Sequence, residues 1–191
     1  MSTARICFLL CIVYVLAGFT VRAPFAIGRV HVTPDSILYL NIAGNVASGR
    51  GYVSSIKLHH VDDANVVHSA WRDCPPLYPL LSGAVMRLGG GLTALTMVNA
   101  LLVSLASGLV FLIGERLFDR RTGLLAGVAA ALAPNLFRAG MTPMSDALAL
   151  ALGLSALALV VRGKPSSLTC AVAGGLSGLA ALTRHPYAVL A

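Results

Sequence analysis

Ionisable side chains that could take part in chemistry gather in one segment of this sequence, between residues 22 and 87. They are Asp35, Lys57, His59, His60, Asp62, Asp63, His68, Arg72 and Asp73. A carboxylate can take a proton from a hydroxyl group, and a cation can stabilise a phosphate leaving group. This segment is therefore the first place to expect a functional site.

The histidines and aspartates of residues 59–63 allow two interpretations. Together with His68 and Asp73 they offer imidazole and carboxylate groups, which are ligands for a divalent cation. No spacing among them is diagnostic of a metal site, and a solvated loop accounts for the same residues. We favour the loop, predict no particular metal ligands, and leave a divalent cation open as a cofactor.

Asp35 differs from these loop residues because it lies where a helix should begin. Thr33 suits the N-cap position and Pro34 the first helical position, so a helix is predicted over residues 34–48. The helix dipole and the free N–H groups of the first turn favour an ionised carboxylate, which is the form that a general base needs. Acidic residues are also common in first turns without any further role.

The composition indicates that a membrane protein carries these residues. Hydrophobic residues make up 57% of the chain and charged residues 11%, against roughly 25% charged residues in an average soluble domain. The 14 Lys and Arg residues outnumber the 7 Asp and Glu residues. Because most basic residues lie between apolar runs, they indicate contact with lipid headgroups and not with nucleic acid.

Five charge-free runs approach or exceed the roughly 17 to 25 residues that cross a bilayer as a helix. The predicted spans are residues 6–21, 91–114, 122–137, 146–161 and 166–183. Charges are expected only at their ends. The predicted fold class is all-α: a polytopic membrane helix bundle with a large exported first loop, residues 22–90, that carries interfacial helices. A second such helix is predicted over residues 77–87, which are too few to span.

The distribution of arginine and lysine predicts the orientation. Residues 115–121 and 162–164 are rich in basic residues, whereas residues 137–146 carry only Arg138, so the first two turns should be cytoplasmic. The N-terminus is then cytoplasmic and residues 22–90 are exported. A cleavable signal peptide is the alternative for the first run, which is longer than most such segments.

Several stretches together resemble one enzyme superfamily. They are Asp35-Ser-Ile-Leu-Tyr39, Ala43-Gly-Asn-Val-Ala-Ser-Gly-Arg-Gly-Tyr52, Pro75-Pro-Leu-Tyr-Pro-Leu-Leu81, Gly114-Glu-Arg-Leu-Phe-Asp-Arg-Arg-Thr-Gly123 and Leu182-Thr-Arg-His-Pro186. In this order they resemble the C-type polyprenyl-phosphate-sugar-dependent glycosyltransferases, of the protein mannosyltransferase and aminoarabinose transferase kind. Such enzymes are usually two or three times longer, so residues 1–191 are expected to be the N-terminal part of one, incomplete as an enzyme.

The resemblance implies transfer of a sugar from a polyprenyl-phosphate-linked donor to a glycan, lipid or protein acceptor outside the cytoplasm. Asp35 matches the catalytic acid position of the family. The substrate-binding residues that it implies are Tyr39, Arg72, Asp146, Arg184 and His185. Arg184 and His185 are the leading candidates for the donor phosphate, with Arg72, Arg138 and Lys57 behind them.

Each of these residues also has an ordinary explanation. Arginines at helix ends commonly anchor a span at the membrane surface, and Asp146 could simply begin a helix. The expected location is the bacterial inner membrane. The rival function is that of a non-catalytic membrane subunit or transporter fragment, although a transporter would carry ionisable residues near the bilayer midplane.

Overall fold

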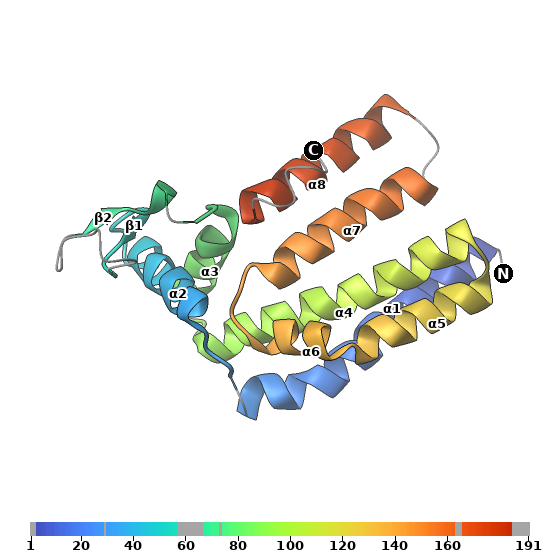
Figure 1. Cartoon of the computed structure of the whole chain (residues 1–191), viewed down its shortest axis with the longest axis horizontal. Helices are drawn as coiled ribbons and strands as arrows, with labels where there is room; N and C mark the ends of the chain where they lie inside the picture. The colour runs from blue at the N-terminus through green and yellow to red at the C-terminus, as the bar shows by residue number, and fades with distance from the viewer. Residues whose placement is uncertain (1–2, 29, 57–66, 73, 163–165, 185–191) are drawn as a thin grey trace.

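The computed structural model describes residues 3–28, 30–56, 67–72, 74–162 and 166–184. Helices dominate this part of the chain (Figure 1). They are α1 (Thr3–Gly28), α2 (Pro34–Ala47), α3 (Leu77–Arg87), α4 (Leu92–Leu117), α5 (Arg120–Leu132), α6 (Pro134–Met141), α7 (Asp146–Arg162) and α8 (Ser167–Thr183). The short strands β1 (Val53–Ser54) and β2 (His68–Ser69) pair antiparallel, and a 3₁₀ turn η1 (Ala70–Arg72) follows them. The predicted all-α membrane bundle is confirmed.

Helix α4 lies at the centre of the bundle, in contact with α1, α5, α6 and α7. Small residues let these backbones approach closely: a Cβ added at Gly108 would lie 2.9 Å from the sulfur of Cys11 on α1. The buried hydroxyl groups of Ser104 and Ser107 donate to carbonyls one turn earlier in α4. Close packing and satisfied polar groups are what hold helices together in lipid.

Two of the described helices are long and apolar enough to cross a membrane, judged by length and composition. They are Leu9–Ile27, within α1, and Leu92–Leu117, the whole of α4. Helices α5 and α6 would form a third span together, although they are bent by 54° relative to each other. A helix also covers each remaining predicted span, and the predicted number of crossings stays a prediction.

The structure differs from the sequence-based expectation in two places. Helix α1 continues past residue 21 to Gly28, so Arg22 lies inside the apolar helix and the expectation of charges only at span ends is wrong there. The helix expected over residues 122–137 is broken, because Pro134 has no N–H for the carbonyl one turn earlier.

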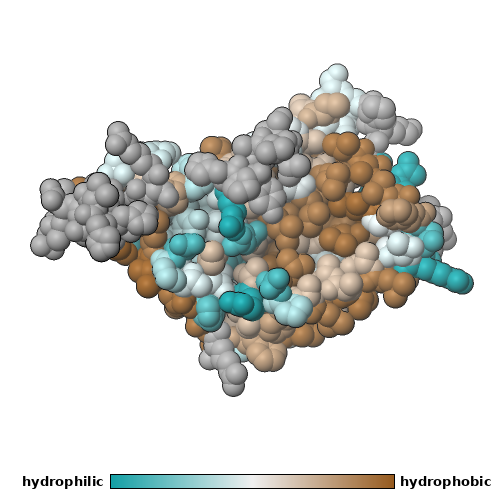
Figure 2. Space-filling view, in the orientation of Figure 1, coloured by the Kyte–Doolittle hydropathy of each residue, from teal (hydrophilic) through white to brown (hydrophobic). Residues whose placement is uncertain are grey.

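The surface supports a membrane location. Hydrophobic residues cover the long helices, whereas hydrophilic residues gather where α4 meets α5 and between α2 and α7 (Figure 2). The chain is an integral membrane protein.

Helices α2 and α3 pack against each other outside the long helices, near the end of α8 (Figure 1). The hydroxyl of Thr33 accepts from the backbone N–H of Ser36, so the predicted N-cap of α2 is present. The helix ends in a Schellman motif at Gly49, which has a φ of 78°. The side-chain amide of Asn45 donates to the carbonyl of Val53 at 2.9 Å and so ties the β-hairpin to α2.

Close packing of α4 against α5 generates the first prediction. A Cβ at Gly123 would lie 2.6 Å from the backbone nitrogen of Glu115 and 2.8 Å from the carbonyl oxygen of Phe111. Gly123→Ala should therefore push the helices apart and destabilise the fold by about 1 to 3 kcal/mol. Thermal unfolding in detergent measures the effect. Gly174→Ala, where an added Cβ meets nothing within 4 Å, should leave the midpoint almost unchanged; an equal loss in both variants would contradict the packing argument.

Candidate functional site

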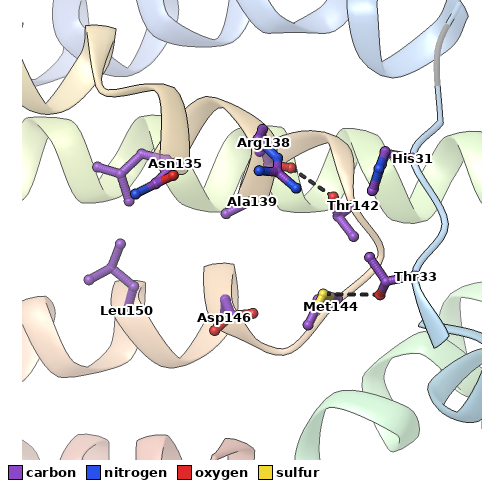
Figure 3. Close-up of a pocket in the computed structure, with 10 residues that line it drawn as sticks. His31, Thr33, Asn135, Arg138, Ala139, Thr142, Met144, Asp146 and Leu150 are labelled. Atoms are coloured by element: carbon purple, nitrogen blue, oxygen red, sulfur yellow. Dashed lines mark hydrogen bonds between the residues drawn. The ribbon is translucent and has the colours of Figure 1, made fainter. Parts of the chain in front are cut away.

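A cavity of about 390 Å³ lies between α6, the beginning of α7 and the segment that joins α1 to α2. Its lining residues are His31, Thr33, Asn135, Leu136, Arg138, Ala139, Thr142, Met144, Asp146 and Leu150. In Figure 3, Asn135 and Arg138 face Asp146 and Leu150 across the cavity, with His31 and Thr33 closing one side. The cavity thus combines a cation, a carboxylate and several hydrogen-bonding groups.

One face of α6, continued by its C-cap Thr142, supplies three of the six polar lining residues. Arg138, Ala139 and Thr142 follow Asn135 by three, four and seven residues, which places all four along one side of a helix. Arg138 is exposed, and no described carboxylate forms an ion pair with it. Its guanidinium group is therefore available to an anion in the cavity.

The turn between α6 and α7 is held by Asn99, a fully buried residue of α4. Its side-chain amide donates to the carbonyl oxygen of Thr142 at 2.5 Å and to that of Met144 at 3.2 Å. The hydroxyl of Thr33 donates to the sulfur of Met144 at 3.4 Å. The backbone N–H of His31 donates to the backbone carbonyl of Met141. These bonds set the position of the cavity wall. Asn99 was not among the residues predicted from the sequence, although an amide in an apolar span is a signal that could have drawn attention to it.

Tyr39 joins α2 to this turn. Its hydroxyl lies 3.1 Å from the hydroxyl of Ser145, and its ring meets that of Tyr78 edge to face at 5.4 Å. Burial raises the pKa of Tyr39, while the hydrogen bond to Ser145 opposes the rise. Burial also raises the pKa of Tyr78 to about 12. Both phenols are therefore neutral at pH 7, where they can act as hydrogen-bond donors.

Asp146 and Arg184, both predicted site residues, form an ion pair with each other. It connects the first turn of α7 to the end of α8. The two side chains are 36% and 43% exposed, so solvent screening limits the pair to about 1 kcal/mol or less. The pairing changes the expectation for Arg184, because the carboxylate of Asp146 occupies the guanidinium group that was expected to bind phosphate.

Asp35 lies exposed in the first turn of α2 and does not line the cavity. Its charge contributes to the raised pKa of Tyr39, one turn along the helix, as a lesser cause. Arg72 belongs to η1, next to β1. His185 and residues 57–66 lie outside the described residues. The structure thus brings Tyr39, Asp146 and Arg184 together.

The structure also bears on Tyr78 and on the possible metal site. Tyr78 is only 2% exposed and is part of the core. Among the described residues, no group of three or more His, Cys, Asp or Glu side chains could hold a metal ion.

Comparison with known families identifies the chain. The sequence model of the dolichyl-phosphate-mannose-protein mannosyltransferase family matches residues 73–191, more than half of the chain. The chain belongs to this family. The suspected superfamily is thereby confirmed. Comparison with curated proteins and with solved structures found no significant match.

Membership makes the chain part of a family of glycosyltransferases that use polyprenyl-phosphate-linked sugar donors. The matched part of this mannosyltransferase-family chain contains Asp146, Arg184, His185 and the cavity face of α6. It begins after Asp35, Tyr39 and Arg72. The roles assigned to all these residues remain predictions.

The environment of Tyr39 yields a titration prediction. Burial disfavours the phenolate, so Tyr39 should ionise above the ordinary value of about 10. The hydrogen bond with Ser145 favours the charged form of Tyr39. Ser145→Ala removes this bond and should therefore move the pKa of Tyr39 still higher. Absorbance titrations of the wild type, Tyr39→Phe and Ser145→Ala in detergent isolate the ionisation of Tyr39 from that of the other tyrosines. A downward shift in Ser145→Ala would refute the assigned contact.

Proposed function

We propose that this protein transfers a sugar from a polyprenyl-phosphate donor to an acceptor on the extracytoplasmic side of the bacterial inner membrane, with Asp35 as the base. The observation that carries the proposal is the junction of α2 with the α6–α7 turn through Tyr39 and Ser145. This contact places the helix that carries Asp35 beside a polar cavity in a chain of a glycosyltransferase family.

The proposed reaction needs a proton acceptor and a stabilised leaving group. The carboxylate of Asp35 takes the proton of the acceptor hydroxyl while the oxygen of that hydroxyl attacks the anomeric carbon of the donor sugar. The bond from that carbon to the phosphate oxygen breaks, and polyprenyl phosphate leaves. Asp35 is exposed at the beginning of α2, where an acceptor can reach it from the aqueous side.

Arg138 is the best-placed cation for the donor phosphate. It faces the cavity and is unpaired among the described residues, whereas Arg184 is paired with Asp146. A guanidinium group offers paired donors to phosphate oxygens and stays charged. The imidazole of His31 and the amide of Asn135 line the same cavity and add hydrogen-bonding groups.

An apolar groove next to the cavity suits the hydrocarbon part of the donor. Between α7 and α8 lies a space of about 430 Å³, lined by residues that include Gly153, Leu157 and Gly174. Leu150 lines both the groove and the polar cavity. The two spaces therefore adjoin, as the head and tail of an amphiphilic lipid require.

Replacing the proposed base tests the reaction. Asp35→Asn should lower the rate of transfer from polyprenyl-phosphate mannose by at least about a hundredfold, because an amide cannot accept the proton. Transfer of radiolabelled sugar by the protein in lipid nanodiscs measures the rate. The matched control is Asp119→Asn at the N-cap of α5, where an amide still accepts the hydrogen bond from Thr122. Equal activity of Asp35→Asn and the wild type would favour a non-catalytic subunit.

The proposed side of the membrane has its own test. Single cysteines replace Ser55, in the segment after α2, and Arg120, at the beginning of α5; both positions are exposed. In a cysteine-free background, a membrane-impermeant maleimide should label Ser55→Cys on intact cells and Arg120→Cys only after permeabilisation. The positive-inside distribution of arginine is the physical reason. The opposite labelling pattern would rule out extracytoplasmic transfer.

A further inference from the structure

Arg22 is a charged residue buried inside the apolar part of α1. Its residue is 1% exposed and lies within the candidate span Leu9–Ile27. The side chain points back along the helix, where one guanidinium nitrogen donates to the carbonyl of Gly18 at 3.0 Å. No described carboxylate forms an ion pair with it. A charge within a membrane span is costly and is by default a candidate for a functional role.

The partners of Arg22 lie at the break between α5 and α6. The second terminal nitrogen of its guanidinium group donates to the carbonyl of Ala131 at 2.7 Å. Ala131 is in the last turn of α5, whose carbonyls lose their helical partners because the chain bends at Pro134. In lipid such a carbonyl needs a donor from within the protein. Arg22 is that donor, so it stabilises the bent arrangement.

Arg22 also packs on the side of α6 that faces away from the cavity. Its guanidinium carbon lies 5.7 Å from the centre of the Phe137 ring, within the range of a cation–π contact. A Cβ added at Gly140 would lie 3.4 Å from the Cδ of Arg22. Phe137 and Gly140 flank Arg138 and Ala139 in the sequence, and the latter two line the cavity. Helix α6 thus has one face on Arg22 and the other on the cavity.

We propose that Arg22 is a positioning residue: by binding the carbonyl freed at the α5–α6 break and the back of α6, it holds Arg138 in place for the donor phosphate. This proposal rests on the proposed function. Arginine is required because two of its nitrogens reach carbonyls of two different helices at once. A lysine has one ammonium group and cannot bridge them in the same way.

Kinetics with a matched control test the positioning role. Arg22→Met should raise the KM for polyprenyl-phosphate mannose roughly tenfold and also lower kcat, because a displaced Arg138 would bind the donor phosphate less tightly and stabilise the leaving group less. Arg22→Lys should restore part of the affinity. The control is Arg87→Met, at the exposed end of α3, which should match the wild type. A KM and a kcat of Arg22→Met that both equal those of the wild type would overturn the proposal.

A structural readout keeps the inference independent of the activity. Spin labels at Asn135→Cys on α6 and Leu159→Cys on α7, both exposed positions, report the distance between these two helices in a cysteine-free background. The distance distribution should shift or broaden in Arg22→Met and, less strongly, in Arg22→Lys. If Arg22→Met fails to fold, Arg22→Lys decides, and a distribution equal to that of the wild type overturns the proposal. If the wild type binds no polyprenyl-phosphate mannose, the proposed function fails, while these distances still decide the role of Arg22 at the break.

Discussion

Backbone carbonyls released by a broken helix in lipid must find hydrogen-bond donors within the protein. The structure meets this constraint at both ends of α6. At its beginning Arg22 donates to the carbonyl of Ala131, and at its end Asn99 donates to those of Thr142 and Met144. The cavity lies beside this short helix, so the groups that satisfy the breaks also decide where the polar lining is.

The same constraint explains why the polar residues are divided between two roles. Those with buried side chains, such as Asn99 and Arg22, bind backbone groups and shape the site. At the surface of the cavity, Arg138 forms no ion pair with a carboxylate of the described residues, so its guanidinium group can donate to a ligand. Tyr39 links α2, which carries Asp35 in its first turn, to the α6–α7 turn, because its hydroxyl lies within hydrogen-bonding distance of that of Ser145.

Much of the fold follows from local patterns in the sequence. Thr33 and Pro34 begin α2 as expected, Pro75-Pro76 precedes α3, and the apolar runs form helices. These features depend on neighbours within a few residues. The break at Pro134 could also have been read locally, because proline lacks the N–H that a continuous helix needs. The extension of α1 past Arg22 could not, since a buried arginine in a span becomes tolerable only through its tertiary contacts.

By itself, the sequence determined that this is a helical membrane protein of a glycosyltransferase family that uses lipid-linked sugar donors, with Asp35 in the first turn of a helix. Tertiary structure alone decided that Asp146 pairs with Arg184, that Arg138 faces the cavity unpaired among described residues, and that Arg22 and Asn99 hold α6. The reason is physical: helix formation follows hydropathy and capping along the chain, whereas a site depends on which distant donors meet the carbonyls and charges that folding leaves without partners.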